Sequence, residues 1–201
     1  RTANLVIGLP GISSEAPAIW CGSHIDSVPQ GGNYDGLAGV IAGLLCLLAQ
    51  QRSGVRSPLP LQVLGFRGEE SAWFGKAYIG SGALLGKLEA DDLALKHRDS
   101  GETLGACMER MAADMAAIHD QQMLFDPQRV RAFLELHIEQ GPVMEARKLP
   151  VAVVSGIRGN IRHNAVQCIG ASGHSGAIPR WLRRDSMFAV ADLVMRLDEH
   201  W

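Results

Sequence analysis

Two imidazoles and four carboxylates lie at points where short apolar runs of the chain end or a new run begins. They are His24, Asp26, Asp35, Glu69, Glu70 and His137. Neutral imidazole and carboxylate oxygen suit zinc, manganese or cobalt, and the absence of thiolates is typical of a catalytic rather than a structural site. If the fold gathers these side chains, they can bind divalent cations and support hydrolysis.

The spacing within this set suggests a role for several of its members. Two cations about 3.5–4 Å apart need a bridging carboxylate, and Asp35 has the short side chain for it. Asp26, two residues beyond His24, is predicted to accept the other ring N–H and fix the tautomer. Of Glu69 and Glu70, one can bind metal while the other takes a proton from a metal-bound water.

Taken singly, each of these residues is more typical of a helix cap, a turn or a solvated surface; their combination at strand ends is the signal. The other histidines are weaker candidates. His97, His119 and His200 are expected at the surface, and His163 is ambiguous. His174 lies in the small-residue loop Ser172-Gly173-His174-Ser175-Gly176, where an exposed imidazole can donate a hydrogen bond.

The elements that must position these side chains follow from hydrophobic periodicity and from Gly and Pro punctuation. Strands are expected over 18–21, 61–66 and 133–138, and helices over 37–51, 103–118 and from about Asp185 onward. Alternating strands and helices predict an α/β fold with a mainly parallel sheet flanked by helices. The carboxyl ends of such strands form a ligand crevice. After Pro150, three further β-like runs are expected, over 151–154, 156–161 and 165–169.

Composition excludes several classes of protein. Hydrophobic residues make up 47% and charged residues 20% of the 201 residues, which is typical of a globular chain. A net charge of -2 argues against nucleic-acid or anionic-membrane partners and favours a small molecule. Four scattered cysteines favour reduced thiols in a cytoplasmic protein. The chain begins at Arg1 and ends at Trp201 within a predicted helix, so we expect it to be truncated at both ends.

Two motifs resemble a known family. Gly22-Ser23-His24-Ile25-Asp26-Ser27-Val28-Pro29 with Gly31-Gly32-Asn33-Tyr34-Asp35-Gly36 is similar to the metal loop of the zinc aminoacylase and carboxypeptidase-like superfamily. Leu136-His137-Ile138-Glu139-Gln140-Gly141-Pro142 resembles its amidase (hydantoinase/carbamoylase) branch, which contains N-carbamoyl-L-amino-acid hydrolases, allantoate amidohydrolases and β-ureidopropionases. The resemblance covers nearly the whole chain, and the second motif is the more specific.

The resemblance implies a zinc-exopeptidase-like catalytic domain with two divalent metal ions, Zn²⁺ or Mn²⁺/Co²⁺. One ion would be held by His24, Asp35 and His137, and the other by Asp35, Glu70 and a histidine beyond Trp201. Glu69 would be the general base, with Asp26 orienting His24. Gln140 would contact the substrate's ureido or amide group. The implied reaction cleaves a linear C–N bond of an N-carbamoyl amino acid or similar ureido compound (EC 3.5.-).

The resemblance also predicts two domains: residues 1–157 as a partial dimetal catalytic domain and residues 158–201 as the start of an inserted α+β lid and dimerisation domain. His174 would stabilise the oxyanion in the partner subunit of a homodimer. Trp73 and Arg180 depart from the usual pattern and leave the substrate open. An aminoacylase or dipeptidase remains an alternative, as does a non-catalytic binding protein, although Glu69 argues against the latter. Residues 1–201 alone are expected to be poorly soluble.

Overall fold

The computed structural model describes residues 2–11, 16–55, 57–157, 159, 163 and 165–200, and these divide into two units. The first unit is Arg1–Pro150 and the second is Val151–Trp201. The predicted boundary between residues 157 and 158 differs from this division, and residue 158 lies outside the described residues. That boundary stays a prediction.

The first unit is built on a sheet of four strands in the order β1-β3-β2-β4. The strands are β1 (Leu5–Gly8), β2 (Ala18–His24), β3 (Leu61–Phe66) and β4 (Val130–Leu134). β2 pairs in parallel with both β3 and β4, whereas β1 pairs antiparallel with β3. The prediction of an α/β fold with a mainly parallel sheet is confirmed. β1 was missed because its four residues are too few to show a period.

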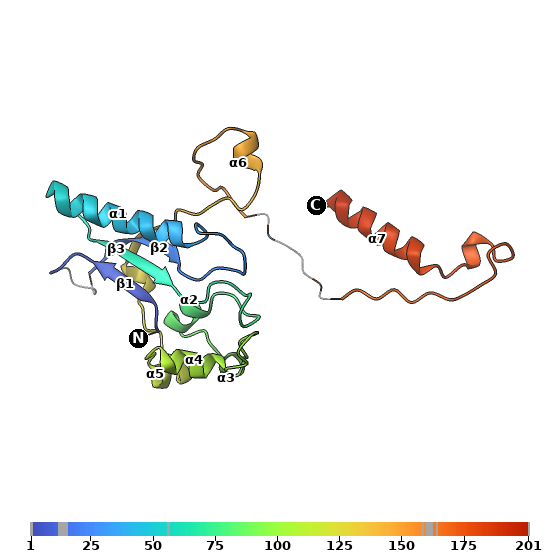
Figure 1. Cartoon of the computed structure of the whole chain (residues 1–201), viewed down its shortest axis with the longest axis horizontal. Coiled ribbons are helices and arrows are strands. Elements are labelled where there is room, and N and C mark those ends of the chain that lie inside the picture. The colour runs from blue at the N-terminus through green and yellow to red at the C-terminus, as the bar shows by residue number, and fades with distance from the viewer. Residues whose placement is uncertain are drawn as a thin grey trace. The chain divides into compact units, whose positions relative to one another are not determined.

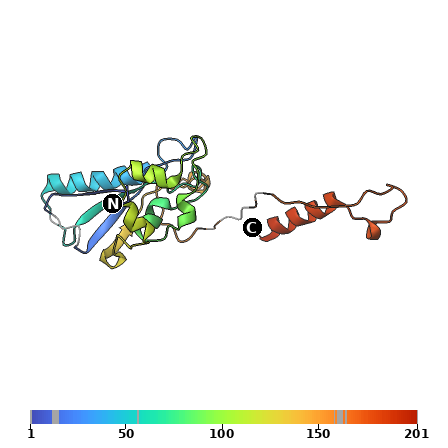
Figure 2. The same cartoon turned by 90° about the horizontal axis from the view of Figure 1, so that it is seen from below.

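Helices cover both faces of this sheet (Figure 1). α1 (Leu37–Ser53) runs along one face, as Figure 2 shows from below, and buries Val40 and Leu47 against Val63. The helix can lie close because a Cβ on Gly43 would come within 2.9 Å of the Cys21 sulfur. On the opposite face, Trp20 and Leu64 pack with side chains from later in the chain. The two central strands, β2 and β3, are therefore apolar on both faces, as strands buried between two layers of helices are.

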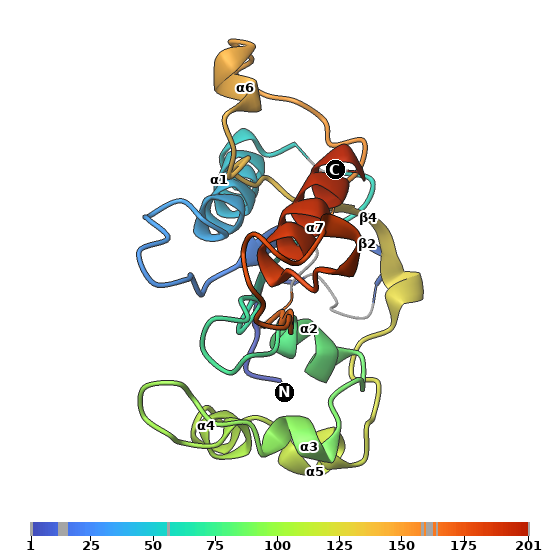
Figure 3. The ribbon, with the colours of Figure 1, turned by 90° about the vertical axis from the view of Figure 1, so that its right-hand side faces the viewer.

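A group of short helices lies on the side of the sheet opposite α1 (Figure 3). They are α2 (Ile79–Leu84), α3 (Ala90–Leu93), α4 (Leu104–Arg110) and α5 (Met115–His119). The predicted single helix over 103–118 is wrong. Ala112 has a left-handed φ of 57°, and Asp114 caps a new helix by accepting a hydrogen bond from the Ala117 N–H. Together these features end α4 and start α5.

The remaining elements are η1 (Pro127–Arg129) and α6 (Val143–Ala146) in the first unit, with η2 (Arg180–Leu182) and α7 (Ser186–His200) in the second. The expected helix near Asp185 is confirmed as α7. The β-like runs over 151–154 and 165–169 form no strand, because a strand needs a hydrogen-bonded partner and the described residues supply none. Part of the run over 156–161 lies outside the described residues.

Two further findings bear on function. All four cysteines are free. No helix among the described residues has the length and apolar character needed to cross a membrane.

Candidate metal centre

The candidate centre forms where β2, β3 and β4 reach their carboxyl ends. His24 is the last residue of β2, Glu69 and Glu70 follow β3, and His137 lies three residues beyond β4. The third strand was predicted over 133–138, but β4 spans Val130–Leu134 because its register with β2 pairs Ala18 with Val130 and Cys21 with Leu134. His137 therefore belongs to the segment after the strand.

Asp35 reaches the centre from the turn before α1. It is 4% exposed, and the next residue, Gly36, has a φ of +66° and lies directly against the His24 ring, so that any Cβ at Gly36 would clash with it. This glycine allows the start of α1 to approach the end of β2. Gly36 therefore serves the placement of a carboxylate beside a histidine.

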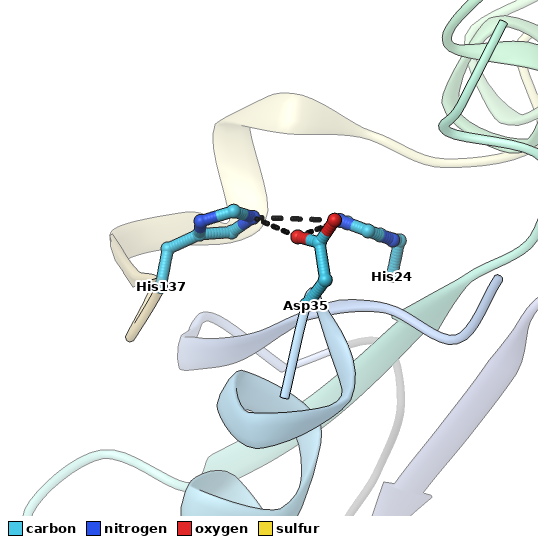
Figure 4. Close-up of side chains that lie close together, drawn as sticks. All are labelled: His24, Asp35 and His137. Carbon is cyan, nitrogen blue, oxygen red and sulfur yellow. Dashed lines mark hydrogen bonds and ion pairs between the residues drawn. The ribbon is translucent and has the colours of Figure 1, made fainter. Parts of the chain in front are cut away.

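Three side chains converge on one point in Figure 4. The Asp35 Oδ1 lies 3.8 Å from the His24 Nε2 and 3.4 Å from the His137 Nε2. The two Nε2 atoms are 3.4 Å apart. His24 is buried, and the His137 side chain is 31% exposed, so the centre is open on one side.

The protonation of both imidazoles follows from their other ring nitrogens. The His24 Nδ1 lies 2.7 Å from the backbone carbonyl oxygen of Asp26, and the His137 Nδ1 lies 2.8 Å from that of Ile138. A carbonyl oxygen only accepts hydrogen bonds, so each Nδ1 carries a proton, and Nε2 is the ring atom with which each imidazole, in its neutral form, can bind a cation. The two Nε2 atoms face one another beside a carboxylate.

A divalent cation fits this donor set. The Asp35 Oδ1 is buried without a hydrogen-bond partner among the described residues, and a buried carboxylate oxygen in that state is costly. His24, Asp35 and His137 each offer one ligand atom, and these atoms lie within 4.8 Å of one another. His24, Glu69 and Glu70 form a second group that meets the same criterion.

Asp26 contacts the centre through both its backbone carbonyl and its side-chain carboxylate. Its backbone carbonyl, not its carboxylate, holds the His24 ring. The carboxylate accepts hydrogen bonds from the backbone N–H groups of Glu69 (3.1 Å) and Glu70 (3.0 Å). The ring N–H of His24 is therefore accepted by the Asp26 backbone rather than by its side chain, because two adjacent amides of the turn after β3 satisfy both carboxylate oxygens. Asp26 links the segment after β2 to the Glu69-Glu70 turn.

The two glutamates lie in a negatively charged environment. Burial raises the pKa of Glu69; His24 and His137 oppose this, whereas Asp26 and Glu135 add to it. Burial also raises the pKa of Glu70, and the carboxylates of Glu69 and Asp35 raise it further. A Glu69 oxygen lies 4.0 Å from the His24 Nε2. A cation would favour the ionised form of all these carboxyls.

Three contacts of the loops beside the centre were not predicted. The buried Ser23 hydroxyl donates a hydrogen bond to Glu135, which ties the end of β2 to the segment that carries His137. The Trp73 indole N–H donates to the Ser27 carbonyl at 2.9 Å, and its ring stacks on His97 with centroids 5.5 Å apart. His97 is therefore packed against a ring rather than lying free at the surface. The signal in the sequence that could have indicated Glu135 is its position two residues before His137.

The remaining predicted residues fall in different places. The Gln140 amide donates a hydrogen bond to the Asp35 Oδ2, so Gln140 joins the centre. His174 lies in the second unit, where its Nδ1 accepts hydrogen bonds from the backbone N–H groups of Gly176 and Ala177. Arg180, also in the second unit, lies over the Phe188 ring at 5.8 Å.

The chain belongs to peptidase family M20/M25/M40, which its sequence matches over residues 20–196. It is 38% identical over 197 residues to an N-carbamoyl-L-amino acid amidohydrolase of Geobacillus stearothermophilus, covering 98% of this chain and 47% of that protein. It is 35% identical over 188 residues to a probable allantoate deiminase of Oryza sativa subsp. japonica, covering 92% of this chain and 38% of that protein.

Solved structures agree with these relatives. A hydantoinase/carbamoylase family amidase from Burkholderia ambifaria has a TM-score of 0.73 and 30% identity, covering 98% of this chain and 46% of that one. The resemblance to the amidase branch is confirmed. The chain spans half or less of the length of the relatives it matches.

Proposed function

We propose that the protein containing this chain is a metal-dependent amidohydrolase that cleaves a linear C–N bond of an N-carbamoyl amino acid or a similar ureido compound. The observation that carries the proposal is the pair of imidazole Nε2 atoms that face each other beside a buried Asp35 oxygen, which has no hydrogen-bond partner among the described residues. The names of the relatives, which include an N-carbamoyl-L-amino acid amidohydrolase and a probable allantoate deiminase, support the ureido substrate class.

In this proposal, His24, Asp35 and His137 would hold one divalent ion. Asp35 and Glu70, with a histidine outside this chain, would hold a second ion. The ligand set suits Zn²⁺, Mn²⁺ or Co²⁺. Bound there, the ions would supply Lewis acidity toward water and the substrate carbonyl.

Glu69 is the proposed proton carrier. Its carboxylate takes a proton from the attacking water as the oxygen–carbon bond forms, and delivers that proton to the leaving nitrogen as the carbon–nitrogen bond breaks. The partial burial that raises the pKa of Glu69 supports the role, because it brings the group closer to the range in which it can both accept and donate. The Asp26 carboxylate positions the Glu69 backbone for this transfer.

Other parts of the proposal rest on the sequence resemblance. Gln140 contacts the substrate's ureido or amide group, and His174 stabilises the developing oxyanion across a homodimer formed through the lid domain. The two amides that donate to the His174 Nδ1 support this role, because they leave the ring proton on Nε2 as a donor. We place the protein in the cytoplasm.

The test uses the full-length protein that contains this chain. We expect about two metal ions per subunit and ammonia release from an N-carbamoyl amino acid or allantoate. Glu69→Gln should abolish turnover and keep the metal, whereas Glu102→Gln, at a half-buried residue outside the centre, should change neither. Turnover of N-acetyl amino acids or dipeptides alone would indicate the aminoacylase alternative. Absence of both metal and turnover would favour a non-catalytic binding protein.

A further inference from the structure

Gln140 has an unusual backbone conformation beside the centre. Its φ is +58°, a left-handed value that residues other than glycine rarely adopt. Such residues persist only where the surrounding structure holds them, and they concentrate at functional sites. The reason for this conformation should therefore be sought in what the Gln140 side chain contacts.

The segment around Gln140 is fixed on both sides. On one side lies His137, whose Nε2 faces Asp35. On the other side, the Glu139 carboxylate accepts hydrogen bonds from the backbone N–H groups of Val143 (3.0 Å) and Met144 (2.8 Å). These contacts hold the turn into α6 in place. Within this turn, Gln140 is the residue that adopts the left-handed conformation.

The Gln140 side chain contacts the carboxylate at the middle of the centre. Its Nε2 donates a hydrogen bond of 3.0 Å to the Asp35 Oδ2. The other carboxylate oxygen, Oδ1, is the one that faces both histidine Nε2 atoms. A carboxylate group rotates readily about its terminal torsion, so a donor on Oδ2 selects the rotation in which Oδ1 faces the imidazoles.

We propose that Gln140 is a positioning residue for Asp35, and that its left-handed backbone is the conformation required to bring the amide to the Asp35 Oδ2. This inference rests on the proposed metal centre. It differs from the substrate contact predicted for the same residue, since it concerns the Nε2 and a metal ligand. The amide then acts on metal affinity even when no substrate is bound.

The experiment compares three variants of the full-length protein: Gln140→Ala, Gln140→Gly and Lys148→Ala. The first two remove the amide. Alanine keeps a Cβ in the left-handed conformation and glycine does not. Lys148 is an exposed residue with a φ of 55°, so Lys148→Ala is the matched control for a left-handed position outside the centre. Two quantities are measured for each variant. One is the thermal midpoint of the metal-free protein, and the other is the affinity for Co²⁺, determined from the visible absorption of the bound ion.

We expect both Gln140 variants to lose about tenfold or more in Co²⁺ affinity, as for other residues that orient metal ligands. Gln140→Gly should have the higher midpoint of the two, the reverse of the usual order of alanine and glycine. Lys148→Ala should bind Co²⁺ like the wild type. Wild-type affinity in Gln140→Gly would overturn the inference and leave the proposed function standing. A wild type that binds no Co²⁺ would overturn both.

Discussion

At the scale of single residues, the centre is organised by backbone carbonyls as much as by side chains. The carbonyl of Asp26 and that of Ile138 each hold one Nδ1, and this directs the Nε2 lone pairs of His24 and His137 toward Asp35. A ligand set prepared in this way loses little conformational entropy when a cation binds. In the metal-free protein, the unfavourable contacts of the centre are those between the two Nε2 atoms and among the neighbouring carboxylates.

The raised pKa of Glu69 predicts how the stability of the metal-free protein depends on pH. Burial raises the pKa of Glu69 in the folded state above the ordinary value of 4.5, so the folded state binds this proton more tightly than the unfolded state. The resulting stabilisation is present below the ordinary pKa and is lost as pH rises through the raised one. In the metal-free protein, Glu69→Gln should therefore raise the thermal midpoint at about pH 8 and change it little at about pH 4.

The control for this prediction has the opposite sign. Arg110 donates a hydrogen bond to Glu102 and lowers the pKa of that carboxyl, so its stabilisation is present at higher pH and lost as pH falls. Glu102→Gln should lower the midpoint slightly at about pH 8, with a small effect because the pair is exposed. An unchanged or lower midpoint for Glu69→Gln at that pH would contradict the account of Glu69.

At the scale of elements, the sequence predicted the helices and strands whose bounds depend on local apolar patterns. The ranges of α1 and β3 follow from apolar runs bounded by Gly and Pro, and both are close to the observed bounds. The predicted range of β4 was wrong because the pairing of this strand with β2, rather than its own composition, determines where it begins and ends. The hydrogen bonds of Gln140 with Asp35 and of Trp73 with Ser27 could not be predicted, because they join loops that meet only in the folded chain.

The approach of α1 to β2 gives a prediction at this scale. Gly36→Ala would add a Cβ that clashes with the His24 ring, in a backbone with a φ of +66°. We expect a loss of about 1–3 kcal/mol in stability from strain and overpacking, and a large loss of Co²⁺ affinity because His24 and Asp35 move apart. Equilibrium unfolding in urea and Co²⁺ titration measure the two effects.

The matched control for that change is Gly32→Ala. Gly32 has a φ of +78° but nothing within 4 Å of the position a Cβ would take. This variant carries the backbone strain without the clash, so it should lose some stability and keep its Co²⁺ affinity. Equal affinity losses in both variants would show that strain in the loop, rather than contact with His24, governs the site.

At the scale of the whole molecule, the strand order brings three of the predicted ligands to the ends of three adjacent strands. β2 is central and supplies His24, while β3 and β4 on either side lead to Glu70 and His137. In the described part of the chain, β4 is also the last strand on its side of the sheet, and it exposes Phe133 (42%) and Leu134 (59%). The strand that leads to His137 thus presents apolar side chains beside unpaired backbone groups.

This edge predicts how residues 1–201 behave when expressed alone. An exposed apolar edge strand is a template for pairing with another chain, so we expect these residues to self-associate. Leu134→Lys should increase the monomer fraction measured by analytical ultracentrifugation, because a charged side chain on the edge disfavours strand pairing. Val153→Lys is the control: Val153 is 97% exposed and lies outside any strand, and the change adds the same charge. If both variants increase the monomer fraction equally, net charge rather than the β4 edge drives the association.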